Sequence, residues 1–349
     1  MLLIAFGLLS LFSFSATSPF PYFKRQVVWV GIGILLLILS SFLDFHIFRT
    51  QGYVVFLFYI IVILLLALVL LINSKIRGIE AWLRVGGLAI QPVELAKLVL
   101  IILFAKFFSK RHIEIYRIQH LIISALYLVI PIFLVLLQPD LGSALILASI
   151  WVVIVIFSGM KLRHFFLLIL LVALLSLGAW GFVLKPYQKA RITSFLNPYQ
   201  DPKGAGYQML QSMIAVGSGR LWGKGLGYGS QTHLHFLPEA ETDFIFAAFA
   251  EEWGFIGVVA MLGLFFFVLW RILAIGVVAS DSFSRLYTIG FAALIFVQGF
   301  IHISMNMGLL PVTGLTLPFV SYGGSSLVTM LVGVGILQNI KINSRREIG

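Results

Sequence analysis

Long apolar runs constrain this sequence more than any other feature. Residues 52–73, for example, read GYVVFLFYIIVILLLALVLLIN and contain no charged side chain. Such a run matches the roughly 20 apolar residues that an α-helix needs to cross a bilayer. By this measure the sequence predicts ten transmembrane helices, at about 2–17, 27–43, 52–73, 92–108, 120–138, 142–158, 164–184, 244–270, 286–306 and 325–340.

Composition supports the same class of protein. Of the 349 residues, 60% are hydrophobic and only 11% are charged, whereas soluble domains carry about 25% charged residues. A soluble fold of this size cannot hide so much apolar surface. We therefore predict an all-α, polytopic integral membrane protein with a single transmembrane domain over residues 1–349. With no cysteine in the chain, disulfides and thiolate chemistry are excluded.

The Lys and Arg residues predict the orientation of the chain. If the N-terminus is inside, most of those that lie outside the longest loop fall in cytoplasmic segments, so both termini are expected in the cytoplasm. Most Asp and Glu residues then lie on or near the outer side, which places any chemistry at the outer face of the cytoplasmic membrane. The net charge of +11 does not indicate a nucleic-acid partner, because the basic residues form no arm or stripe.

One large extracytoplasmic loop, about 185–243, separates the seventh and eighth predicted spans. Its aromatic residues and the glycine-spaced stretch GSGRLWGKGLGYGS (217–230) indicate a structured loop rather than a linker. The stretch matches neither the P-loop nor the GxGxxG pattern. Its glycines permit positive φ and close backbone approach, and an anion such as a lipid pyrophosphate remains an alternative ligand for such a backbone.

Ionisable residues at the edges of spans are candidates for chemistry, because charges there are costly. In QPVELAK (91–97), Glu94 and Lys97 are three residues apart and share one helix face. They form either a structural ion pair or a site where the lysine meets a phosphate and the glutamate positions it or a cation. Asp140, in QPDLG (138–142), either caps the next helix or belongs to a site.

Five acids crowd around the start of the eighth predicted span. Asp243, in ETDF, is either a helix cap, with Thr242 as the competitor, or a general base whose pKa is raised by apolar surroundings and nearby carboxylates. We expect Glu251 or Glu252, further along the span, to serve packing. In the ninth span Gln298, His302 and Asn306 recur every four residues, a pattern typical of polar contacts between membrane helices.

Taken together, these motifs resemble the shape, elongation, division and sporulation (SEDS) family of peptidoglycan polymerases, and their forms are closer to its RodA branch than to its FtsW branch. The motifs are FKRQ (23–26), QPVELAK (91–97), QPDLGSAL (138–145), PYQKARITSFLNP (186–198), GAGYQMLQS (204–212), GKGLGYGSQ (223–231), FLPEAETDFIFAAFAEEWGFIG (236–257) and GLLPVTGLTLPFVSYGGSS (308–326). The resemblance covers nearly the whole chain.

The resemblance implies a peptidoglycan glycosyltransferase that polymerises lipid II into β-1,4 glycan strands, with inversion and release of undecaprenyl pyrophosphate, in support of cell elongation and rod shape. The family pattern places the catalytic base at Asp243 and the QPSE-x-x-K acid and lysine at Glu94 and Lys97. Lys97 would meet the pyrophosphate charge. The residues expected to bind substrate are Trp82, Asp140, Glu239, Arg191 and Lys224.

The chain departs from the family pattern at several positions. Ala81 stands where the family has Arg, Val93 where it has Ser, and Glu241 where His is frequent. The first change bears on Trp82 and its loop, and the last adds a negative charge near Asp243.

The resemblance also implies partners. These are lipid II, the growing glycan strand and a class B penicillin-binding protein that cross-links the product. No cofactor is assigned, and a divalent cation (Mg²⁺ or Mn²⁺) held by Glu94 stays an open alternative. Two other functions are also open: a lipid II flippase, and a non-catalytic scaffold that activates a partner penicillin-binding protein.

Overall fold

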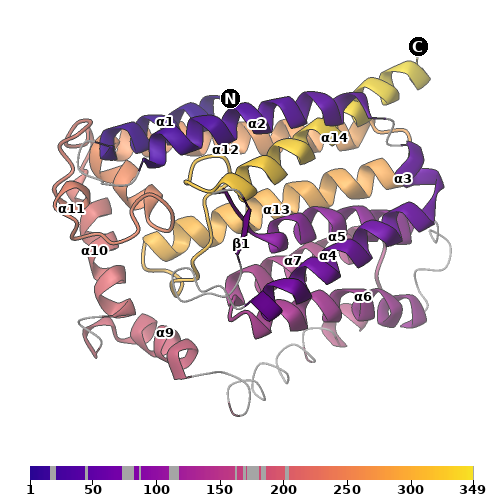
Figure 1. Ribbon diagram of the computed structural model, residues 1–349, viewed down its shortest axis with the longest axis horizontal. Coiled ribbons are helices and arrows are strands. Elements are labelled where there is room, and N and C mark those ends of the chain that lie inside the picture. Colours follow the sequence, from indigo (N-terminus) through magenta and orange to yellow (C-terminus); the bar gives the residue numbers. More distant parts are fainter. Residues whose placement is uncertain are drawn as a thin grey trace. The chain divides into compact units, whose positions relative to one another are not determined.

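The computed structural model describes a predominantly helical chain (Figure 1). The described residues are 1–15, 21–43, 46–72, 82–85, 88–109, 118–161, 163–167, 170, 181, 186–200 and 204–348. Every predicted span coincides with a helix except 164–184, most of which lies outside the described residues. Glu80 and Ala81 also lie outside them.

The described residues contain 6 helices long and apolar enough to cross a membrane. They are Tyr22–Phe42, Gly52–Ile72, Gln119–Leu137, Ile245–Val278, Ser282–Asn306 and Gly324–Ser344. Two shorter helices, Leu2–Phe14 and Leu141–Phe157, are apolar as well. The prediction of a helical polytopic membrane protein is therefore confirmed.

The chain divides into two compact units. Unit 1 comprises Met1–Val27, Leu162–Phe266 and Gln298–Tyr322, and unit 2 comprises Val28–Lys161, Phe267–Val297 and Gly323–Gly349. The helices α2 (Tyr22–Phe42), α12 (Ile245–Val278) and α13 (Ser282–Asn306) contribute residues to both units.

Unit 2 is organised around a buried helix. Its own elements are α3 (His46–Thr50), α4 (Gly52–Ile72), β1 (Leu83–Val85), β2 (Leu88–Ile90), α5 (Pro92–Ser109), α6 (Ile118–Leu137), α7 (Leu141–Phe157) and α14 (Gly324–Ile348). The central helix α5 contacts α3, α4, α6, α7 and α14, and almost all of its residues are buried (Figure 1). Because its neighbours bury Glu94, Lys97 and Lys106, α5 can carry these charged residues inside an apolar bundle.

A short antiparallel hairpin precedes α5 and was not predicted from the sequence. Leu83 pairs with Ile90 and Val85 with Leu88. Trp82 directly precedes this hairpin, so the pairing places its backbone opposite Gln91, where α5 is about to begin. The strands are too short to produce a recognisable period-two pattern.

Unit 1 holds the large loop between the seventh and eighth predicted spans, and the start of α12. Its own elements are α1 (Leu2–Phe14), α9 (Pro186–Leu196), the 3₁₀ turn η1 (Pro198–Gln200), α10 (Ala205–Ser218) and α11 (Ser230–His233). The helix α10 contacts α9, η1 and α11, which confirms a structured loop over its described part. The long helix α12 is interrupted at Gly254, whose φ of 66° and ψ of −168° are not helical.

Candidate active site

Asp243 lies in a turn that leads into α12. The backbone amides of Asp243 and Phe244 both donate to the carbonyl of Glu239, at 3.1 and 3.2 Å. Glu239 adopts a positive φ of 52°, which closes the turn. The Asp243 residue is partly exposed, whereas Phe244 and Ile245 beyond it are buried. The carboxylate therefore stands at the border between an accessible edge and an apolar interior.

Asn306, at the end of α13, holds this turn from the other side. Its side-chain amide nitrogen donates to the backbone carbonyl of Asp243 at 3.0 Å, and its oxygen accepts from the amide of Ala247 at 3.1 Å. Asn306 has no exposed surface. In α12, which begins at Ile245, the Ala247 amide is one of those that lack an intrahelical acceptor. Asn306, from α13, accepts this hydrogen bond, a role that a capping residue next to the helix start usually has.

The segment between α13 and α14 packs against the same turn. The Ser321 hydroxyl donates to the carbonyl of Thr242 at 2.8 Å, and the Tyr322 amide donates to that of Glu241 at 2.9 Å. Gly314, with φ 75°, lies against Asp243, because a Cβ built there would be 3.6 Å from Oδ2. The turn that carries Asp243 is thus fixed at three successive residues.

Arg191 connects the loop helix α9 to this arrangement. Its Nη1 donates to the carbonyl of Val312 at 3.3 Å. Val312 is two residues before Gly314, so the PYQKARITSFLNP motif contacts the chain segment that lies against Asp243. The structure brings these two motifs together, although Arg191 itself is bonded to a backbone carbonyl.

In the polar stripe on α13, Asn306 bonds to Ala247 of α12, as expected for contacts between helices, whereas Gln298 and His302 bind the non-helical segment that follows α13. Gln298 Nε2 donates to the carbonyl of Thr316 at 2.9 Å, and His302 Nδ1 lies 2.7 Å from the carbonyl of Leu315. Gln298 and His302 therefore satisfy the backbone of a non-helical segment that lacks a regular hydrogen-bond ladder. The sequence pattern indicated polar contacts but not the role of Asn306 in the same stripe as a support for Asp243.

A second group of charged residues lies inside unit 2. Lys97 Nζ is 2.8 Å from Glu94 Oε1, and Lys97 is fully buried while Glu94 is 4% exposed. The predicted pairing on one helix face is confirmed. The other oxygen of Glu94, Oε2, is buried without a hydrogen-bond partner, so this carboxylate has an unused acceptor in a low-dielectric setting.

Asp140 caps α7, as one of its two predicted roles requires. Its Oδ1 accepts from the amide of Ser143 at 2.9 Å and its Oδ2 from the Ser143 hydroxyl at 2.7 Å. Burial raises the pKa of Asp140 from its usual 3.8, while the bonds from Ser143 and the charge of Lys97 oppose the shift and Glu94 adds to it. The cap is therefore electrostatically coupled to the Glu94–Lys97 pair.

Gln91 joins this cluster to the GGSS segment. Its Nε2 lies 3.4 Å from Asp140 Oδ2, and its backbone amide donates to the Ser325 hydroxyl at 3.0 Å. Ser325 in turn donates to the carbonyl of Ala89 at 3.2 Å. QPVELAK, QPDLG and GGSS are thus in contact within unit 2.

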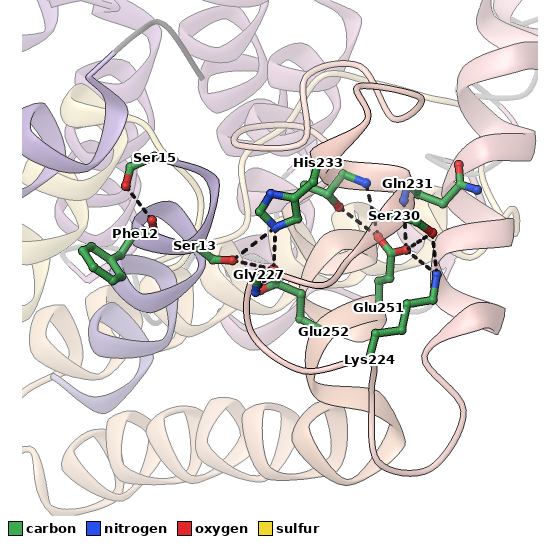
Figure 2. Close-up of polar contacts among 11 residues, drawn as sticks. Phe12, Ser13, Ser15, Lys224, Gly227, Ser230, Gln231, His233, Glu251 and Glu252 are labelled. Carbon is green, nitrogen blue, oxygen red and sulfur yellow. Dashed lines mark hydrogen bonds and ion pairs between the residues drawn. The ribbon is translucent and has the colours of Figure 1, made fainter. Parts of the chain in front are cut away.

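Glu251 and Glu252 hold the glycine-rich loop, in keeping with the expected structural role. Glu251 accepts from Lys224 Nζ at 2.7 Å and from the amides of Gln231 and Thr232 at 2.9 and 3.2 Å (Figure 2). Lys224, a predicted substrate ligand, is therefore engaged in an ion pair. Glu239, another such candidate, accepts from the Thr242 hydroxyl at 3.3 Å.

The predicted site residues fall into both units. Asp243, Glu239, Arg191 and Lys224 belong to unit 1, and Trp82, Glu94, Lys97 and Asp140 belong to unit 2. Among the described residues, no group of three or more His, Asp or Glu side chains is placed to hold a metal ion. Because Mg²⁺ commonly binds through one or two carboxylates together with waters and substrate phosphates, a divalent cation held by Glu94 stays a prediction.

Comparisons with known proteins place this chain. The model of the cell cycle protein family FtsW/RodA/SpoVE matches residues 1–346. Stage V sporulation protein E of Bacillus subtilis is 39% identical, with 99% of this chain and 95% of that protein covered. Peptidoglycan glycosyltransferase MrdB of Escherichia coli is 36% identical, with 91% and 85% covered.

A solved structure is similar as well. It is described as showing structural coordination of polymerization and crosslinking by a peptidoglycan synthase complex, and the matching chain superposes with a TM-score of 0.81 at 34% identity, covering 98% of this chain and 96% of that one. The whole length of this chain therefore has relatives of known class. The chain belongs to the FtsW/RodA/SpoVE family of cell cycle proteins, the SEDS family.

Proposed function

We propose that this protein polymerises lipid II into β-1,4 glycan strands at the outer face of the cytoplasmic membrane. The protein is a peptidoglycan glycosyltransferase. Its relative MrdB is named for this activity, and the similarity to MrdB covers 91% of this chain. The substrate, the stereochemistry and the residue roles given below are part of the proposal. The proposal also includes ten membrane spans, cytoplasmic termini and a role in cell elongation.

In the proposed reaction Asp243 is the general base. It accepts the proton of the acceptor sugar's 4-hydroxyl as that oxygen attacks the anomeric carbon of the donor. The new glycosidic C–O bond forms while the bond from the anomeric carbon to the pyrophosphate oxygen breaks. Undecaprenyl pyrophosphate leaves, and the α linkage of the donor becomes a β linkage. A single displacement of this kind needs one base on the acceptor side.

The setting of Asp243 is the observation that carries this assignment. It is a partly exposed acid with buried residues directly after it, so a sugar can reach the carboxylate. Its backbone is bonded through Asn306 at 3.0 Å and through the Glu239 carbonyl at 3.1 Å. Such double support limits the movement of a base relative to its substrate, as proton transfer at hydrogen-bond distance requires.

Lys97 and Glu94 have a supporting role in the proposal. Lys97 would stabilise the negative charge that develops on the pyrophosphate, and Glu94 would orient it through their 2.8 Å contact. Because Lys97 has no exposed surface, direct contact with a phosphate requires that the side chains covering it move. Trp82 and Arg191 are proposed to contact the substrate, with Asp140 as the cap that supports Lys97.

A class B penicillin-binding protein is the proposed partner. The similar solved structure is described as a complex that coordinates polymerization with crosslinking, which supports a division of labour between a strand-forming subunit and a cross-linking subunit.

The test is a polymerisation assay with purified protein and lipid II in detergent, with and without the penicillin-binding partner. Wild type, Asp243→Asn and the neighbouring control Glu241→Gln are compared by product length on gels, after thermal melts confirm folding. We expect polymer from wild type and the control, and none from Asp243→Asn. Equal polymer from all three would rule out Asp243 as the base. If none of the three proteins makes polymer, and wild type moves lipid II across the bilayer of liposomes, the result would favour a flippase.

A further inference from the structure

Large apolar side chains are exposed on the glycine-rich loop of unit 1, residues 219–229. Leu221 is 60% exposed, Trp222 79%, Leu226 47% and Tyr228 77%. Together with Arg220, which is also exposed, they combine aromatic, aliphatic and cationic character within a few residues. Aromatic side chains with an amphipathic ring and cationic neighbours are typical of the membrane–water interface.

This loop is fixed to the interruption in α12 by backbone hydrogen bonds. The amides of Lys224 and Gly225 donate to the carbonyls of Glu251 and Glu252, at 2.9 and 3.0 Å. On the other side of the break, the amides of Phe255 and Ile256 donate to the carbonyls of Arg220 and Leu221, at 2.8 and 3.2 Å. The loop therefore lies alongside residues 251–256 and replaces the helical bonds that Gly254 interrupts.

The surroundings of α12 change at this break. From Ile245 to Glu252 every residue is buried. After the break one face is open, with Phe255 60% exposed, Ile256 47% and Val259 50%. Exposed apolar residues on a helix apolar enough to span a membrane are expected to face lipid.

The length of α12 locates the break relative to the bilayer. The helix ends at Val278, so the part after the break, from Phe255, extends for about 36 Å at 1.5 Å per residue. That is sufficient to cross a hydrocarbon core of roughly 30 Å. The break, and the loop bonded to it, then lie at one boundary of the core.

From this geometry we propose that residues 219–229 are a membrane anchor whose exposed side chains bind the lipid interface. Trp222 and Tyr228 lie at the headgroup level, Leu221 and Leu226 enter the acyl chains, and Arg220 meets lipid phosphates. The surface is continuous with the lipid-facing side of α12, because Phe255 and Ile256 are bonded to the loop residues Arg220 and Leu221.

The burial and pairing of Glu251 and Glu252 agree with a location at the boundary of the hydrocarbon core. Glu251 and Glu252 are 0% and 2% exposed, and Figure 2 shows the donors around them. Lys224 and Gly227, both in the loop, supply a cation and an amide, the latter 3.0 Å from Glu252 Oε1. Carboxylates near a hydrocarbon core must be covered and paired, and the loop does both while its apolar side chains point outward.

The absence of cysteine allows a direct depth measurement. Single-cysteine variants Trp222→Cys and Tyr228→Cys, with Phe266→Cys as the reference deep in α12, are labelled with bimane. They are reconstituted into vesicles of phosphatidylglycerol and phosphatidylcholine. Lipids with a doxyl group near the headgroup or near the chain end, and aqueous iodide, are the quenchers. Retained thermal melts confirm that each variant is folded.

We expect labels at 222 and 228 to lose most of their fluorescence to the headgroup-proximal doxyl lipid. The label at 266, whose side chain is 58% exposed, should be quenched best by the chain-end doxyl lipid. Labels at 222 and 228 that are quenched by iodide and insensitive to both doxyl lipids would overturn the proposal and assign the exposed cluster to water or to a protein partner. Because no enzymatic turnover is measured, this result is independent of the proposed polymerase function.

Discussion

The side-chain amide of Asn306 donates to the backbone carbonyl of Asp243 and accepts from the amide of Ala247. One buried side chain thus joins the end of α13 to the turn before α12 and to its first turn. Asp243 is held through its own backbone, which leaves the position of the carboxylate dependent on a residue far away in the sequence.

Replacement of Asn306 is therefore expected to affect both stability and the proposed catalysis. Asn306→Ala leaves the buried Ala247 amide without an acceptor, which costs about 1–3 kcal/mol. It also releases the Asp243 carbonyl, so polymerisation should fall further than the loss of folded protein explains. The measurements are thermal melts and the pH profile of lipid II polymerisation.

Gln298→Ala is the matched control for this variant. Gln298 lies on the same face of α13 but binds Thr316, not the Asp243 turn. Gln298→Ala should lower the melting temperature and leave the pH profile of lipid II polymerisation unchanged. Identical pH profiles for Asn306→Ala and wild type would contradict the positioning role.

Two glycines of the loop beside the break in α12, Gly223 and Gly227, should differ in their tolerance of alanine. A Cβ at Gly223 would overlap the carbonyl of Glu252, whereas a Cβ at Gly227 meets no atom within 4 Å. Both have positive φ, 80° and 83°, so each pays the conformational cost of about 1–2 kcal/mol. Only Gly223→Ala adds a backbone clash.

Thermal melts of the two alanine variants measure the difference. We expect Gly223→Ala to fold poorly and Gly227→Ala to be only mildly destabilised. Equal melting temperatures would contradict the close contact between Gly223 and the Glu252 carbonyl.

Lys224 and Glu251 should be energetically coupled. Their atoms are 2.7 Å apart, and the glutamate side chain is fully buried while the lysine is 29% exposed. In a double-mutant cycle, Lys224→Met should destabilise the Glu251→Gln background less than wild type, by on the order of 1 kcal/mol. The readout is unfolding in mixed micelles.

Glu252→Gln provides the comparison, because Glu252 binds Gly227, Ser13 and His233 instead. The cost of Lys224→Met should change less in that background. A larger coupling to Glu252 than to Glu251 would argue against the ion pair.

The pH dependence of stability should report on Asp140. Because burial raises its pKa above the usual 3.8, the folded state binds this proton more tightly than the unfolded state. Stability therefore decreases as pH rises from 3.8 through the raised folded pKa. Asp140→Asn keeps a good capping residue and removes the titration.

The measurement is the melting temperature as a function of pH for wild type and Asp140→Asn. The difference between them should favour the variant increasingly as pH rises through that window. Ser143→Ala, which removes a hydroxyl bond that lowers the pKa of Asp140, should extend the window upward. A pH-independent difference for Asp140→Asn would contradict the predicted shift.

Local relationships in this protein were predictable from the sequence. The Glu94–Lys97 pair and the Asp140 cap are each defined within three residues, so helix geometry alone indicates them. The apolar runs likewise predicted the helices α1, α2, α4, α5, α6, α7, α12, α13 and α14, but not α3, α9, α10 or α11. The extension of α12 to Val278 was missed, because the predicted span ended before the charged residue Arg271.

Relationships over long separations were not predictable. An isolated glycine such as Gly254 is tolerated within a helix, so the sequence cannot distinguish a continuous helix from one that a distant loop completes. Asn306 and Asp243 are joined across 63 residues, and the spacing of the polar stripe revealed its face but not its partner. The resemblance to the SEDS family indicated Asp243, whereas Asn306, which supports it, is too far away in the sequence to be linked to it by spacing.

The hydrogen bonds that Glu251 and Glu252 accept from the glycine-rich loop and the residues after it have a consequence for inhibitor design. The amides of Gly227 in the loop and of Gln231 and Thr232 in α11 already bind the carboxylates of Glu251 and Glu252. A pyrophosphate mimic aimed at these amides would compete with tethered anions whose effective concentration a free compound does not reach. Compounds aimed at this loop should therefore be uncharged and able to separate it from α12.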